Sequence, residues 1–97
     1  MKGTVKFEEG RVYTDQYSKL IEATYPCTYK VIHRTPKYIT IEVVDSWTFF
    51  KGYIQGLILT RVFIHCDEQT NTEFVNLYTD KGEFIGKISA AYLISDN

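Results

Sequence analysis

The sequence lacks several features that would each assign the protein to a well-defined class. It contains only two cysteines, and its first residues do not include the apolar segment that directs secretion. We therefore expect reduced thiols and a cytoplasmic location. No stretch approaches the roughly 18 consecutive apolar residues of a membrane-spanning helix, so we expect no membrane partner.

An excess of charge of one sign is also missing. The formal net charge is -1 at pH 7, which excludes a strongly basic nucleic-acid-binding domain and a highly acidic mimic of nucleic acid. Internal repeats, low-complexity runs and linkers are absent from the sequence, and 97 residues suffice for one core but not for two. We expect residues 1–97 to form a single domain.

Aromatic and β-branched residues, by contrast, are abundant. Apolar residues make up 44% of the chain and aromatic residues 15%, with eight Tyr and six Phe. This is the composition of a folded domain, and its many Tyr, Phe, Thr, Ile and Val residues favour strands over helices.

Residues 28–44 show the clearest pattern, two alternating runs joined by one turn. The positions that share a face are Tyr29, Val31 and His33 in the first run and Ile39, Ile41 and Val43 in the second. A period of two lets each strand bury one side and expose the other. Pro36 cannot donate a ladder hydrogen bond and favours an extended Thr35, so residues 34–37 are the expected turn.

One earlier segment has helical spacing. The residues that gather on one helical face are Tyr13, Tyr17, Leu20, Ile21 and Thr24. Thr14 can act as the N-cap, Asp15 places a carboxylate in the first turn, and Pro26 opposes continuation. The pattern predicts a helix at about residues 15–23 that packs on the sheet.

The second half of the chain alternates again between turn residues. We expect strands at residues 4–7, 60–66, 73–79 and 84–90. The expected class is mainly β (α+β), a small SH3-like or similar barrel of about five to six strands with one short N-terminal helix. Closing the sheet would remove the edges that short strands otherwise expose.

The stretch TYKVIHRTPKYITIE, followed by RVFI, EFV and IGKISAA, resembles small uncharacterised phage and bacterial proteins, which share a run of the form T-x-Y-x-V-x-x-R-T-x-K-x-(V/I)-T. The matching residues are Tyr29, Val31, Arg34, Thr35, Lys37, Ile39 and Thr40. The resemblance extends from Tyr25 onward, and Pro36 and residues 45–59 depart from it. It implies a small barrel and a phage or mobile-element setting, and it carries no catalytic signature.

Candidate catalytic and metal-binding residues are few. The residues that suggest zinc are Cys27, His33, His65 and Cys66, but their spacing is not that of a zinc site, and adjacent residues on a strand point to opposite faces. Asp45, Ser46 and His33 could be imagined as a triad, yet no strained nucleophile turn surrounds the serine. Gly52 and Gly56 lack the Lys and Ser/Thr of a phosphate loop. We expect no enzyme, no metal and no cofactor.

Protein binding is the first functional hypothesis. The aromatic residues Trp47, Phe49, Phe50 and Tyr53 lie close together in one segment, and aromatic side chains are the usual anchors of interfaces. We expect a binding module that contacts or inhibits another protein, a host protein in the host cytoplasm if the protein is phage-encoded, or that forms a homodimer. The competing interpretation is that these side chains complete a small core.

Nucleic-acid binding is the alternative hypothesis. Lys30 and Arg34 are expected on one face of the first strand of the hairpin, and Lys37 and Tyr38 begin the second. Small barrels can combine basic side chains with aromatic stacking platforms on a strand face. The competing interpretation is a solvated outer face.

Overall fold

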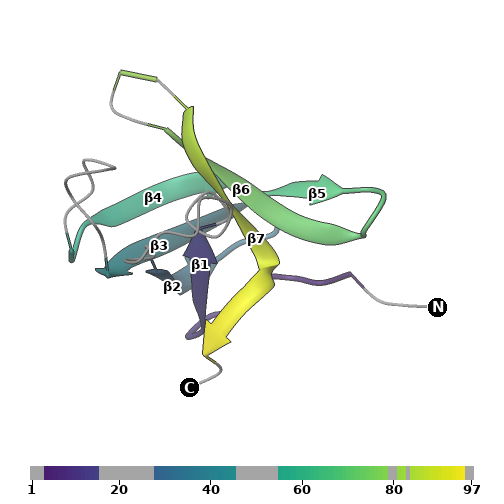
Figure 1. Ribbon diagram of the computed structural model, residues 1–97, viewed down its shortest axis with the longest axis horizontal. Helices are drawn as coiled ribbons and strands as arrows, with labels where there is room; N and C mark the ends of the chain where they lie inside the picture. The colour runs from purple at the N-terminus through teal and green to yellow at the C-terminus, as the bar shows by residue number, and fades with distance from the viewer. Residues whose placement is uncertain (1–3, 16–27, 46–54, 79–80, 83, 96–97) are drawn as a thin grey trace.

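The computed structural model describes residues 4–15, 28–45, 55–78, 81–82 and 84–95, and every regular element within them is a strand. The strands are β1 (Val12–Asp15), β2 (Thr28–Arg34), β3 (Tyr38–Asp45), β4 (Ile58–Phe63), β5 (His65–Asp67), β6 (Thr72–Tyr78) and β7 (Phe84–Ser95). They pair antiparallel in the order β4-β3-β2-β1-β7-β6-β5, and the sheet curls into a half-barrel (Figure 1). A search of the described residues finds no helix that is long and apolar enough to cross a membrane.

The mainly β class is therefore confirmed, but the residues expected to begin a helix form a strand. Tyr13, Thr14 and Asp15 belong to β1, and Tyr13 pairs with Tyr29 of β2. The Tyr13 ring packs edge-on against Phe7, with ring centroids 5.0 Å apart. Tertiary pairing thus overrides the helical spacing at these positions. The rest of the predicted helix, residues 16–23, lies outside the described residues.

The described sheet has seven strands rather than five to six. One additional strand is β1, and another arises because the strand expected at residues 60–66 is divided at Ile64. The strand expected at residues 4–7 is reduced to one parallel bridge between Val5 and Thr72, while Phe7 is buried in the core.

The hairpin at residues 28–44 is confirmed as β2 and β3. The turn is closed by a 2.8 Å hydrogen bond from the Thr35 amide to the Tyr38 carbonyl. Tyr29 and Val31 of β2 are buried, and so are the alternate β3 residues Ile39, Ile41 and Val43. The period of two therefore assigned both inner faces correctly, apart from exposed His33.

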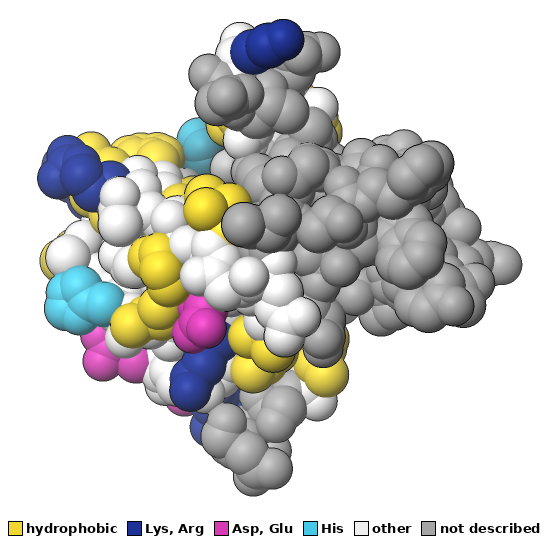
Figure 2. All heavy atoms as spheres, turned by 90° about the vertical axis from the view of Figure 1, so that its left-hand side faces the viewer, with side chains coloured by type: hydrophobic (Ala, Val, Ile, Leu, Met, Phe, Trp, Pro, Cys, Tyr) yellow, Lys and Arg dark blue, Asp and Glu magenta, His cyan; other side chains and the backbone are white. Residues whose placement is uncertain are grey.

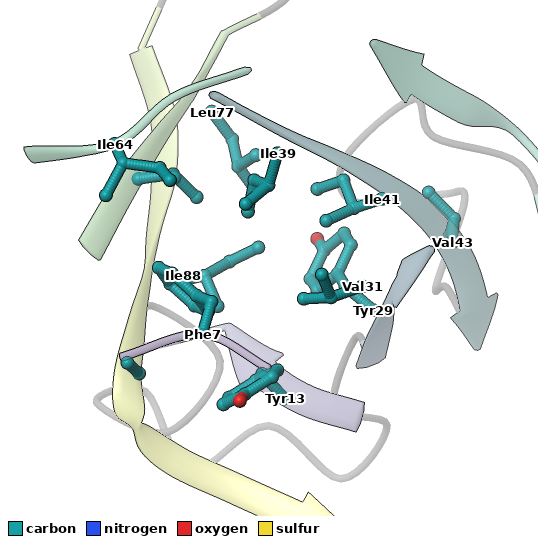
Figure 3. Close-up of a cluster of buried hydrophobic side chains, with 12 residues drawn as sticks. Phe7, Tyr13, Tyr29, Val31, Ile39, Ile41, Val43, Ile64, Leu77 and Ile88 are labelled. Atoms are coloured by element: carbon teal, nitrogen blue, oxygen red, sulfur yellow. The ribbon is translucent and has the colours of Figure 1, made fainter. Parts of the chain in front are cut away.

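The core lies on the concave side of the curled sheet. Side chains from β2, β3, β6 and β7 converge there with Phe7, Tyr13 and Ile64 (Figure 3). Val75 and Leu77 of β6 are buried, as their alternation predicted. Partly buried Leu57, Leu59 and Val62 extend this core along β4.

A bulge in β2 changes which side chains face the core beyond Val31. Val31 pairs with Ile41, but His33 pairs with Thr40, so β2 contains one extra residue. The bulge leaves both Ile32 and His33 exposed and places Arg34 opposite buried Ile39. Lys30 and Arg34 therefore do not share a face, contrary to our expectation from unbroken alternation.

The two end strands of the sheet follow one another in the chain. Only Ile64 separates β4 from β5, and its amide donates to the Lys37 carbonyl at 2.8 Å. The chain thus pairs with β3 before Ile64 and with β6 after it, which brings the ends of the curled sheet together (Figure 1). This junction defines the candidate site.

Candidate binding site

An open cleft of about 440 Å³ lies where β4 and β6 separate. One wall consists of residues 58–63 and His65, and the other consists of Asn76, Leu77 and Tyr78. The β5–β6 ladder ends at the pair His65–Phe74. Continued in register, it would pair Phe63 with Asn76, but β4 pairs only with β3 among the described strands. The cleft is therefore a gap between two strand edges.

Exposed apolar side chains border this cleft. Ile58, Phe63 and Tyr78 line it and are 45%, 47% and 50% exposed. Phe84, 59% exposed, extends the apolar surface through an edge-to-face contact with the Tyr78 ring at 5.9 Å. Four large apolar side chains in one region are what a protein-binding surface requires, whereas scattered single ones need no explanation.

The described lining of the cleft contains one formally charged side chain. Arg61 lies in the wall, and neither Asp nor Glu is among the described residues that line the cleft. The Arg61 guanidinium lies over the Tyr38 ring, 4.6 Å from its centroid, and makes no ion pair with a described carboxylate. The described lining therefore presents one positive charge among apolar and uncharged polar side chains.

A row of rings runs from the cleft across the outer face of the sheet. Phe63 contacts Tyr38 edge-to-face at 5.8 Å and His65 edge-to-face at 4.8 Å. His65 stacks on Phe74 at 5.1 Å, and the Lys87 ammonium lies 4.2 Å from the Phe74 centroid. We call Tyr38, Phe63, His65 and Phe74 the aromatic row; a cation caps each end of it.

The strand pairing explains this row. Tyr38 lies opposite Phe63 across β3 and β4, and His65 lies opposite Phe74 across β5 and β6. Directly opposed side chains on one sheet face approach closely enough for ring contact. The alternation of residues 60–66 already placed Phe63 and His65 on one face, but the row cannot be predicted from it because Tyr38 and Phe74 join them only after strand pairing.

A largely buried ion pair joins β2 to β6 on the core side of the sheet. Arg34 donates to the Glu73 carboxylate at 2.7 and 3.2 Å and to the Phe7 carbonyl at 2.9 Å. The Phe7 amide donates to the same carboxylate at 2.9 Å. Hydrogen bonding to Glu73 raises the pKa of Arg34 above its usual value. Because the Arg34 guanidinium already donates to Glu73 and Phe7, the group forms a structural link and not an open anion site.

The residues predicted for protein binding cannot be placed in this site. Trp47, Phe49, Phe50 and Tyr53 lie outside the described residues. The cleft instead uses apolar side chains of β4, the first strand after that segment, and of β6, which lies farther along the chain. Exposed aromatic side chains were expected in a domain of this size, and Phe63, Tyr78 and Phe84 are such side chains.

The residues of the nucleic-acid alternative are not brought together. Lys30 lies opposite Glu42 on the exposed face, Arg34 is directed toward Glu73, and Lys37 is exposed beside the turn. Only Tyr38 contributes to the aromatic row. On the face shown in Figure 2, Lys and Arg side chains alternate with Asp and Glu side chains and uncharged surface, so the described residues form no continuous basic area there.

The residues weighed for metal binding or catalysis are also separated. His33 Nδ1 lies 3.0 Å from Glu9 Oε2, whereas His65 is stacked in the aromatic row and Cys66 is exposed. Cys27 and Ser46 lie outside the described residues. Within the described ranges there is no group of three or more His, Cys, Asp or Glu side chains that could hold a metal ion. Comparison with protein-family models, curated proteins and solved structures gives no match for the chain.

Proposed function

We propose that this protein is a non-enzymatic binding module that contacts another protein through the β4–β6 cleft. The observation that carries the proposal is the apolar border of Ile58, Phe63 and Tyr78 around a gap between two strand edges. Burial of exposed apolar side chains drives most protein association, and large aromatic anchors dominate its energetics. The resemblance to small phage proteins supports a host protein in the cytoplasm as the partner, and inhibition as the outcome.

The proposal is tested by affinity capture from a lysate of the native cell or host. The bait proteins are the wild type, the cleft variant Ile58→Asp and the control Ile32→Asp. Ile32 is 43% exposed on β2 and is not among the residues that line the cleft. We expect the wild type and the control to retain the same protein and the cleft variant to lose it. Equal capture by all three folded proteins would contradict the proposal.

Single-stranded nucleic acid is the second candidate partner, supported by the aromatic row and its two capping cations. Exposed rings can stack on bases while Arg61 and Lys87 neutralise phosphates. We rank it second because His65 stacks on Phe74 and Lys87 lies over the same ring, which leaves little of that ring for a base.

This second candidate makes its own prediction. Binding of a fluorescent oligothymidine should weaken steeply as salt rises, and the double substitution Tyr38→Ala with Phe63→Ala should abolish it. The absence of any anisotropy change at low salt would exclude nucleic acid, and the protein-binding proposal would be unaffected.

A further inference from the structure

The backbone of β4 turns alternate peptide groups into the cleft. The Val43 amide donates to the Leu57 carbonyl at 2.9 Å, so the alternate β3 residues Ile41 and Val43 direct their backbone groups toward β4. Leu59, opposite Ile41, directs its own groups back toward β3. Ile58 and Thr60 must then point their N–H and C=O groups away from β3, into the cleft.

The facing edge of β6 is arranged in the same way. Val5 pairs with β6 through the Glu73 amide and the Asn71 carbonyl, on the side opposite β5. The alternate residues Phe74 and Asn76 therefore direct their backbone groups toward β5 and the cleft. Phe74 lies opposite His65, but the ladder stops before Asn76. Both walls thus carry backbone donors and acceptors that no described strand pairs across the gap.

The bulge in β4 accounts for the missing ladder. Between the pairs Ile39–Val62 and Ile41–Leu59, β4 holds two residues opposite the single residue Thr40. One of the two, Arg61, has a φ of 54°, a left-handed conformation that L-residues seldom adopt. A bulge bends its strand and increases the local twist. Both bulge residues, Thr60 and Arg61, line the cleft, so the bulge places the Arg61 side chain in the cleft wall.

We propose that the cleft binds an extended peptide segment of the partner as an added strand, paired with the backbone of β4 at Ile58 and Thr60 and carrying a carboxylate for Arg61. This inference rests on the proposed function and specifies the partner's conformation and charge. Strand addition takes its affinity from main-chain hydrogen bonds and its specificity from alternate side-chain contacts. Here the alternate contacts are the exposed Ile58, Phe63 and Tyr78. Among the described lining residues Arg61 carries the only formal charge, and this positive charge favours an acidic side chain on the bound segment.

The decisive substitution removes one backbone donor, and its control loses the same threonine side chain. Thr60→Pro deletes the N–H that faces the cleft, and proline is tolerated on a strand edge whose N–H is not part of a ladder. Its matched control is Thr60→Ala, which retains the N–H. Far-UV circular dichroism and urea unfolding establish that each variant is folded.

The probes are linear peptides selected on the wild-type protein from a random display library, with affinities measured by fluorescence anisotropy. We expect the selected peptides to share an Asp or Glu and to bind Thr60→Pro about tenfold more weakly than Thr60→Ala. We expect Arg61→Ala to weaken the acidic peptides. N-methylation along a selected peptide should impair binding at every second residue, because alternate N–H groups face the neighbouring strand.

The outcomes separate this inference from the proposed function. Peptides that lose affinity for Ile58→Asp but ignore both Thr60→Pro and N-methylation would overturn strand addition while supporting the cleft as the protein-binding site. Peptides that bind Ile58→Asp as well as wild type would contradict both. Failure to select any peptide, or self-association through the cleft in sedimentation experiments, would overturn the extended-peptide occupant. If Thr60→Pro does not fold, the N-methylation pattern alone decides.

Discussion

The Arg34 guanidinium holds the Glu73 carboxylate at 2.7 and 3.2 Å and so joins β2 to β6 across the interior of the half-barrel. The same guanidinium and carboxylate also bind the backbone of Phe7, which fixes the segment preceding β1. The pair is largely withdrawn from solvent, with 21% of the Arg34 side chain and 10% of the Glu73 side chain exposed. Four hydrogen bonds thus depend on one buried carboxylate and its partner.

Removal of that carboxylate should be strongly destabilising. Glu73→Ala leaves the Arg34 charge and the Phe7 amide without their acceptor, and the expected loss in free energy of unfolding is about 3 kcal/mol. Urea denaturation measures the loss. The matched control is Glu8→Ala, which removes an exposed pair with Arg11 and should change stability by less than about 1 kcal/mol. Equal midpoints for the two variants would show that the buried pair does not stabilise the fold.

Ile64 should be a second position of high sensitivity. It is the only residue between β4 and β5, and it is buried in the core. Ile64→Ala should lower the free energy of unfolding by about 2–4 kcal/mol through lost burial and a residual cavity. Exposed Ile32 provides the matched control, since Ile32→Ala should cost less than about 1 kcal/mol. Similar urea midpoints for the two variants would contradict the placement of Ile64 in the core.

The backbone at Arg61 predicts an unusual order of substitutions. At a φ of 54°, valine is strongly disfavoured, whereas asparagine tolerates the left-handed region. Both substitutions remove the cation over the Tyr38 ring, so that loss cancels in their comparison. We expect Arg61→Val to be about 1 kcal/mol less stable than Arg61→Asn in urea unfolding. The reverse order would mean that the bulge adopts an ordinary strand conformation.

Tyr13 should make stability depend on pH in the alkaline range. Burial, followed by the nearby Glu8 charge, raises the pKa of Tyr13 above 10.0, although the hydrogen bond from the Glu8 amide opposes the shift. As the pH rises past 10, Tyr13 loses its proton in the unfolded chain before it does so in the folded chain. The stability that neutral Tyr13 contributes is therefore complete below that pH and is lost as the pH rises toward the folded pKa.

Comparison with Tyr13→Phe isolates this effect, because every other tyrosine is shared. The stability of the wild type relative to Tyr13→Phe should be constant up to about pH 9 and should fall as the pH rises past 10, measured as the difference in free energy of unfolding at each pH. A difference that stays constant as the pH rises past 10 would show that Tyr13 titrates alike in the folded and unfolded chains.

Some inner faces could be predicted because they depend on local alternation alone. Val75 and Leu77 are buried, and Ile39, Ile41 and Val43 line the core as the period of two predicted. The same rule failed for Arg34, because one extra residue in β2 exchanges the inner and outer faces beyond it. Tyr13 was misassigned for a different reason, since its helical spacing competed with pairing to β2 and β7 that no local pattern reveals.

A mainly β domain, the β2–β3 hairpin and most inward-facing positions follow from local sequence, because strand preference and alternation are properties of neighbouring residues. Three features emerge only from the folded chain: β4 and β5 meet at Ile64, Arg34 binds Glu73, and the strand edges at Thr60 and Asn76 face one cleft. These features depend on bulges and long-range register. A shift of one residue moves a side chain to the other face of the sheet, and local alternation does not reveal where such a shift occurs.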